Sequence, residues 1–135
     1  MTINWKTSLK KADATFGRGA SAEQIKKAEE ALAMSFPEEY KAFLAEVGWA
    51  EIETDSGPLS IAGLGDAPKD LQLVSIAREA RLSGVEAHWL PIADEGDFLF
   101  LDTRPGQGAV VCFEESEVRS LAESFADWLL AELDE

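Results

Sequence analysis

The chain has 135 residues, 46% of them hydrophobic, and its 26 Asp and Glu side chains against 12 Lys and Arg give a net charge of −14. This length and composition predict one soluble domain over residues 1–135, with a core large enough to fold without disulfides. The acidity excludes nucleic acid and anionic membranes as partners, because both are bound through Lys and Arg, and it favours a basic partner.

The N-terminal part of the sequence predicts three helices. The first spans 2–14 and ends before a Gly-rich break. Ser21 and Gln24 form a capping box, in which each side chain bonds the other residue's free backbone N–H, and the second helix follows. Pro37 suits the first position of the third helix, and Gly48 is an expected left-handed cap at its end. The spacing of the third helix predicts a buried stripe of Tyr40, Phe43, Leu44 and Val47.

The middle of the chain predicts strands at 49–54 and 59–62 and then a helix at 69–82, because Gly, Pro, Asp and Ser turns bound these segments. Three more strands and a closing helix are predicted at 89–93, 98–101, 109–113 and 116–133. The buried stripe of that closing helix is expected to be Val118, Leu121, Phe125, Trp128 and Leu129.

The later strands differ in their expected positions. Pro91 places its strand at an edge or makes it a strand start. The strands at 98–101 and 109–113 are apolar on both faces, so we expect them to be central and covered on both sides. Short turns join them as antiparallel hairpins, and the predicted fold class is α+β, a single mainly antiparallel sheet flanked by helices.

The charge is unevenly distributed along the chain. Residues 1–30 carry six basic and four acidic side chains, a net charge of +2. Residues 31–113 carry −9, and residues 114–135 carry −7. This asymmetry either folds into a surface with two differently charged sides or only keeps the protein dispersed in solution.

Little in the sequence supports catalysis or metal binding. Cys112 is the single cysteine and His88 the single histidine, so no intrachain disulfide and no zinc site are expected. We expect an inert buried thiol and a surface or strand-edge imidazole. The acidic segment 94–97 lacks the alternating acids of a calcium loop and predicts a tight turn. No catalytic residues, cofactor or metal are therefore predicted.

The N-terminus lacks the continuous apolar region of a signal peptide, and no segment is long and apolar enough to span a membrane. A cytoplasmic location is the expectation. The oligomeric state leaves no mark in the sequence.

Several motifs in a fixed order resemble the SUKH superfamily, which includes yeast cell-wall-assembly regulators and bacterial immunity proteins. The resemblance covers about residues 22–130, and it departs from the family pattern at Val47, where an asparagine usually precedes the glycine. The motifs are Glu29-x-x-Leu32, Pro37-x-x-Tyr40-x-x-Phe43-Leu44, Trp89-Leu90-Pro91-Ile92-Ala93-Asp94-x-Gly96-Asp97-x-Leu99-x-Leu101-Asp102 and Ser124-Phe125-Ala126-Asp127-Trp128-Leu129.

The resemblance implies an α+β fold and protein binding rather than catalysis. Many bacterial members look like immunity proteins, which neutralise a cognate toxin by binding it, and such toxins are often basic nucleases. An acidic inhibitor suits a basic toxin, because its carboxylates take the places of phosphates. Two alternatives stay open: a cellular scaffold or regulator without a toxin partner, and a small-molecule-binding or hydrolytic domain that uses a carboxylate pair.

The candidate partner-binding residues lie on the first hairpin and on the later acidic turn. Trp49 is either an interface anchor or a core residue, since aromatic side chains serve both roles. Asp97 and Asp102 match family positions, and we expect them to make hydrogen bonds within turns. The candidates are Trp49, Glu51, Glu53, Asp55, Asp94, Glu95 and Asp97.

Overall fold

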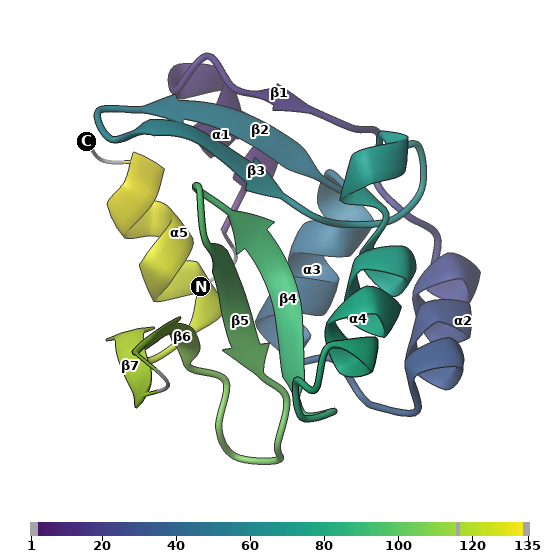
Figure 1. Cartoon of the computed structure of the whole chain (residues 1–135). Coiled ribbons are helices and arrows are strands. Elements are labelled where there is room, and N and C mark those ends of the chain that lie inside the picture. Colours follow the sequence, from purple (N-terminus) through teal and green to yellow (C-terminus); the bar gives the residue numbers. More distant parts are fainter. Residues whose placement is uncertain (1–2, 116, 134–135) are drawn as a thin grey trace.

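The computed structural model describes residues 3–115 and 117–133, which form five α-helices, one 3₁₀ turn and seven strands (Figure 1). The elements are α1 (Trp5–Lys11), β1 (Thr15–Phe16), α2 (Ala22–Leu32), α3 (Glu38–Glu46), β2 (Ala50–Thr54), β3 (Gly57–Ile61), η1 (Lys69–Leu71), α4 (Leu73–Leu82), β4 (Trp89–Asp94), β5 (Phe98–Asp102), β6 (Val110–Glu114), β7 (Glu117–Ala122) and α5 (Phe125–Leu133). The strands form one antiparallel sheet in the order β1-β2-β3-β4-β5-β6-β7, which confirms the α+β class.

The sheet has two unlike faces. In Figure 1, α3 lies behind β4 and α4 lies beside it; α5 packs against α3 and β7, and α2 packs against α3 and α4. We call the face toward α3 and α5 the inner face and the opposite one the outer face. The inner face is apolar because alternate strand residues point into the core: Ala50, Ile52, Leu59, Ile61, Leu90, Ile92, Leu99, Leu101 and Val110.

An aromatic cluster joins the helices to this core. The predicted stripe of α3 is confirmed, because Tyr40, Phe43, Leu44 and Val47 are all fully buried. The Phe125 ring meets the rings of Tyr40 and Phe43 edge-on, each at 5.2 Å. The Tyr40 hydroxyl donates to the Ala62 carbonyl at 2.8 Å, so this buried polar group is paired. Burial raises the pKa of Tyr40, which stays neutral.

Acidic side chains of the helical layer hold helix ends. Glu46 of α3 accepts the N–H groups of Trp5 and Lys6 at the start of α1, at 3.0 and 2.9 Å. Glu39 accepts the N–H of Ala126 at the start of α5, at 3.1 Å. Carboxylates at helix N-termini satisfy free N–H groups and favour the positive end of the helix dipole.

The predicted helix ends are largely confirmed. The Ser21 hydroxyl accepts the Gln24 N–H at 3.1 Å and the Gln24 side chain accepts the Ser21 N–H at 2.8 Å, so the capping box is present. Gly48 has φ +83°, the expected left-handed conformation. Pro37 is the residue just before α3 rather than its first residue.

The backbone at Gly63, just after β3, lies very close to the backbone at Gly48, just after α3. A Cβ placed on Gly63 would lie 1.5 Å from the Gly48 carbonyl oxygen. Only a residue without a side chain fits there. Gly63 also bonds the backbone of Leu71 and Leu73 across Gln72, whose extended conformation separates η1 from α4. The single helix predicted at 69–82 is therefore broken at Gln72.

The largest wrong prediction concerns the C-terminal segment. The sequence predicted one helix over 116–133, but residues Glu117–Ala122 are strand β7 and only Phe125–Leu133 are helical; Ser116 lies outside the described residues. Val118 pairs with Phe113 of β6, Leu121 lies at the bulge of the same hairpin, and the two are 51% and 38% exposed, not buried. The rest of the stripe, Phe125, Trp128 and Leu129, is buried as predicted.

Three other expectations need correction. Strands β5 and β6 are internal in the sheet, but they are not covered on both sides, since Phe98 and Phe113 on the outer face are 48% and 37% exposed. The helix predicted at 2–14 is α1 (Trp5–Lys11), and β1 follows it; Thr2 lies outside the described residues. The edge or strand-start prediction for Pro91 is wrong, because β4 lies between β3 and β5 and begins at Trp89; Pro91 is tolerated there because β3 pairs with β4 only at Ala93 and Asp94.

Candidate protein-binding surface

The strand register brings acidic and aromatic side chains onto one face. Glu51 pairs with Ser60, Ser60 with Asp94, and Asp94 with Phe98. Side chains directly opposite in an antiparallel pair point to the same side. The first hairpin and the later acidic turn therefore share the outer face. A β-bulge between Pro91 and Ala93 sets the register that places Asp94 there.

An aromatic patch continues this face over the C-terminal strands. We define it as Trp89, Phe98, Phe100, Phe113 and Val118. The Phe113 ring lies 4.9 Å from Phe100 and 5.7 Å from Trp89, between ring centroids, and Val118 is its partner across the β6–β7 hairpin. Phe100 lies beneath, almost buried, while Phe98, Phe113 and Val118 are exposed. Partly exposed aromatic side chains next to one another are typical of binding surfaces.

An ion pair between buried Asp102 and exposed Arg104 fixes one end of the patch. Asp102 accepts the Nε and Nη2 hydrogens of Arg104 at 3.0 and 2.7 Å, and the Arg104 backbone N–H at 3.1 Å. These bonds hold the guanidinium 5.5 Å from the centre of the Trp89 ring. The Arg104 side chain lowers the pKa of Asp102, which is consequently ionised at neutral pH. Turn hydrogen bonding, the role expected for both Asp102 and Asp97, is confirmed for Asp102 and is wrong for Asp97, whose side chain makes no hydrogen bond with a described residue.

Acidic side chains border a hollow at the exposed end of the patch. This hollow has a volume of about 740 Å³ between the β4–β5 turn and the β6–β7 hairpin. Phe113 and Val118 form its apolar wall. The acidic side chains that line it are Asp97, Glu114, Glu115 and Glu117. Arg119, the one basic lining residue, is paired with Glu114 at 2.9 Å.

The six acidic candidates from the sequence are all exposed: Glu51, Glu53, Asp55, Asp94, Glu95 and Asp97. The Asp94 side chain accepts the Gly96 N–H at 2.8 Å and thereby shapes the predicted acidic turn. None of the other five side chains forms a hydrogen bond or ion pair with another described residue. They differ in this from Glu39 and Glu46, whose carboxylates hold helix ends.

Trp49 does not join this surface. It is 8% exposed and packs with Ala67 and Leu71, and its indole N–H donates to Asp66 at 3.1 Å. The backbone N–H of Arg18 and this indole lower the pKa of Asp66. The geometry fits the second of the two roles left open for Trp49, that of a core residue tying β2 to the loop before η1.

The comparison with known protein families matches residues 19–131 to the SMI1 / KNR4 family (SUKH-1). The chain belongs to the SUKH-1 family. A comparison with curated proteins found no match. The sheet and its helical layer agree with a SUKH-like α+β fold, and SUKH proteins are known for protein–protein interaction as immunity proteins.

Asp102, His88 and Cys112 are the side chains of the SUKH-1 domain that invite comparison with catalytic or metal sites. Asp102 is the one buried charged side chain in the part of the chain described, and its pKa is lowered, whereas a general acid needs a raised one. The His88 ring lies tilted against the Trp89 ring, 4.5 Å apart between centroids, and Cys112 is half-buried against the core. Within residues 3–115 and 117–133, no three His, Cys, Asp or Glu side chains are placed to hold a metal ion.

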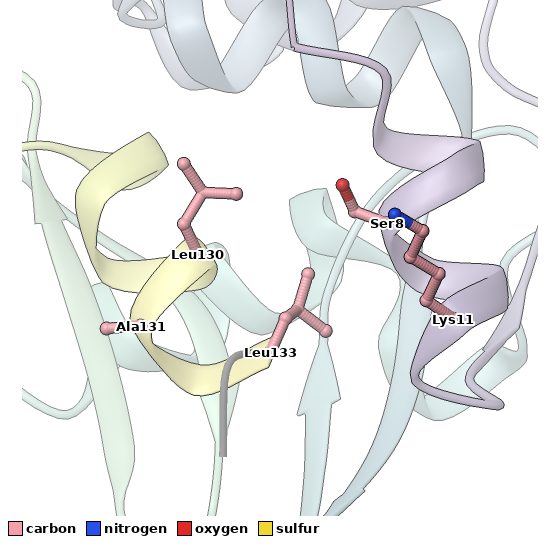
Figure 2. A pocket seen from close by; sticks show the side chains of 5 residues that line it. All are labelled: Ser8, Lys11, Leu130, Ala131 and Leu133. Atoms are coloured by element: carbon pink, nitrogen blue, oxygen red, sulfur yellow. The ribbon is translucent and has the colours of Figure 1, made fainter.

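The SUKH-1 domain also has a hollow on its helical side, and its lining differs from the acidic lining of the hollow beside the patch. Figure 2 shows Leu130 and Leu133 of α5 across from Ser8 and Lys11 of α1, around a space of about 410 Å³. No acidic side chain lines it among the described residues. Helix α1, which forms one wall of this hollow, carries three lysines and no acid. Among the same residues, no helix is long and apolar enough to cross a membrane.

Sequence reasoning missed the residues that define the aromatic patch of this SUKH-1 domain. Phe98 and Phe113 were expected under a covering layer, and Val118 in a buried helix stripe. The sequence does carry one signal for a hairpin here, the acidic run 114–117 directly after an apolar strand. Such a run between two β-branched segments fits a hairpin turn as well as a helix start.

Proposed function

We propose that this chain is a protein-binding module that acts as an immunity protein and neutralises a cognate toxin by binding it directly. The observation that carries the proposal is the row of unpaired carboxylates on the outer face, continuous with exposed aromatic side chains. Family membership supports it, since SUKH proteins are known as immunity proteins. The partner is a basic protein, with a nuclease as the leading toxin class.

The charge of the outer face gives the proposal its physical basis. Glu51 and Glu53 lie on the same side of one strand, and Asp94 lies two strands away on the same face. Like charges at such spacing repel one another, and basic side chains of a partner relieve this repulsion on binding. A field of one sign also steers a basic protein toward the surface and speeds association. A nuclease already carries basic side chains where it binds phosphates.

The test is to search the genes beside this one for a toxin domain and to co-express any such domain with this chain. The proposal predicts that cells producing both proteins grow, that cells producing the toxin alone do not, and that the two proteins co-purify as a complex. Growth arrest despite abundant folded immunity protein, together with separate elution of the two proteins, contradicts the proposal. Binding to several endogenous proteins without a toxin gene nearby supports the scaffold alternative instead.

A further inference from the structure

We infer that the aromatic patch anchors the partner, and that it takes a segment in which an apolar side chain is flanked by Lys or Arg. This inference rests on the proposed function as a protein-binding module and names where and how the module binds. The inference adds strand β7 to the surface, a part of the chain that the sequence placed in a helix.

Three side chains of the aromatic patch are exposed and adjoin one another. Phe98, Phe113 and Val118 are 48%, 37% and 51% exposed, although they adjoin one another through Phe100 and the β6–β7 pairing. Single exposed apolar residues are common on proteins, but neighbouring ones on one sheet face mark interaction sites. Aromatic side chains near the centre of an interface carry much of the binding free energy.

The charge around the patch selects the partner. Asp97, Glu115 and Glu117 line the hollow beside Phe113 and Val118, and none of the three pairs with a described cation. Carboxylates beside an apolar surface repel acidic segments and attract basic ones. A second copy of this chain is disfavoured as the occupant, because it would bring the same acids together at a net charge of −14.

The patch is rigid before binding. Phe113 is held by ring contacts with Phe100 and Trp89, and Trp89 is in turn held by Arg104, whose guanidinium is fixed by Asp102. A side chain that is already ordered loses little conformational freedom when a partner docks. The ion pair therefore acts as a positioning element for the aromatic anchor.

The probe is a short synthetic peptide in which Leu and Lys alternate, titrated at low salt and followed by backbone amide NMR. Shifts are expected in β5, β6, β7 and their turns, and a Ser/Lys peptide of equal charge should bind about tenfold more weakly. Val118→Ser should weaken binding of the Leu/Lys peptide by about tenfold. The matched control is Leu130→Ser, which removes an apolar side chain of similar exposure, 39%, from the helical side and should leave binding unchanged.

Several results overturn the inference. They are equal binding of the Ser/Lys peptide, equal effects of the two variants, or shifts centred on the helical layer. A dimer of the chain alone that Val118→Ser dissociates also overturns it, since the occupant is then a second copy. Val118 is exposed on an edge strand, so the spectrum of this variant should stay that of the folded protein; Phe98→Ser provides a second variant.

The inference and the proposed function fail in different ways. Peptide binding at the patch without binding of the neighbouring toxin contradicts the immunity role and leaves the surface standing. Toxin binding that Val118→Ser does not weaken contradicts the surface and leaves the immunity role standing.

Discussion

The ion pair between Asp102 and Arg104 provides a sharp test of how the outer face is held. Asp102→Asn keeps the shape of the side chain and removes its charge. It also turns an amide N–H₂ toward a guanidinium nitrogen, because the carboxylate now accepts three N–H groups of Arg104, at 2.7 to 3.1 Å. The variant should therefore lose stability without leaving a cavity.

The size of the stability loss in Asp102→Asn follows from how deeply Asp102 and Arg104 are buried. Asp102 is 3% exposed, so charge-assisted hydrogen bonds to it count more than those on the surface. The side chain of Arg104 is 53% exposed, however, and water solvates it once the bond is lost. We expect Asp102→Asn to lower the free energy of unfolding by about 1–2 kcal/mol near neutral pH, at the lower end for hydrogen bonds to charged groups.

The pH dependence of this stability loss tests whether the charge of Asp102 is its cause. The pKa of Asp102 is lowered from its ordinary value of 3.8, so the folded state favours the ionised carboxylate. Its contribution to stability is complete well above 3.8 and is lost as the pH falls toward the lowered pKa. The difference between the wild type and Asp102→Asn should therefore shrink below about pH 5.

Urea unfolding followed by tryptophan fluorescence measures this difference at several pH values. Glu114→Gln is the control, because Glu114 pairs with Arg119 at 2.9 Å while both side chains are exposed. An exposed pair of this kind contributes little, so the control should unfold like the wild type. Equal stability of Asp102→Asn and the wild type, or a difference that does not change with pH, refutes the reasoning.

Three further substitutions test the fold by urea unfolding. Ser21→Ala removes the capping box and should cost about 1 kcal/mol, whereas an unchanged midpoint would show that α2 does not need it. Tyr40→Phe removes the buried bond to the Ala62 carbonyl and should cost about 1–2 kcal/mol; a variant as stable as the wild type contradicts that bond. Gly63→Ala places a methyl group against the Gly48 carbonyl and should be the least stable of the three; wild-type stability would exclude the close crossing.

The elements predicted well from the sequence are those with local signals. Helix α3 has acids at its start, an i, i+3, i+4, i+7 apolar stripe and Gly48 at its end, and all of these concern neighbouring residues. Strand β7 has no comparable signal. Val118 and Leu121 continue the helical spacing of α5, and only pairing with β6 makes them part of a strand. Long-range pairing of this kind overrides a local pattern.

The candidate surface was predictable in part. Charged side chains such as Glu51 and Asp94 are expected at the surface wherever the chain places them. Their position on one face depends on the register across β2, β3 and β4, including a bulge that the sequence does not announce. The exposure of Phe98 and Phe113 was not predictable, because a strand with apolar residues on both sides predicts cover on both faces.

The central claim is that the outer face, and not the net charge alone, attracts a basic protein. The most direct measurement is the association rate of the chain with a toxin domain that the co-expression test identifies, for two double variants that raise the net charge of −14 equally. Glu51→Gln with Glu53→Gln changes the outer face, and Glu30→Gln with Glu79→Gln changes exposed acids of the helices α2 and α4. The account predicts slower association and a weaker salt dependence for the first pair only. Equal rates for the two pairs would contradict it.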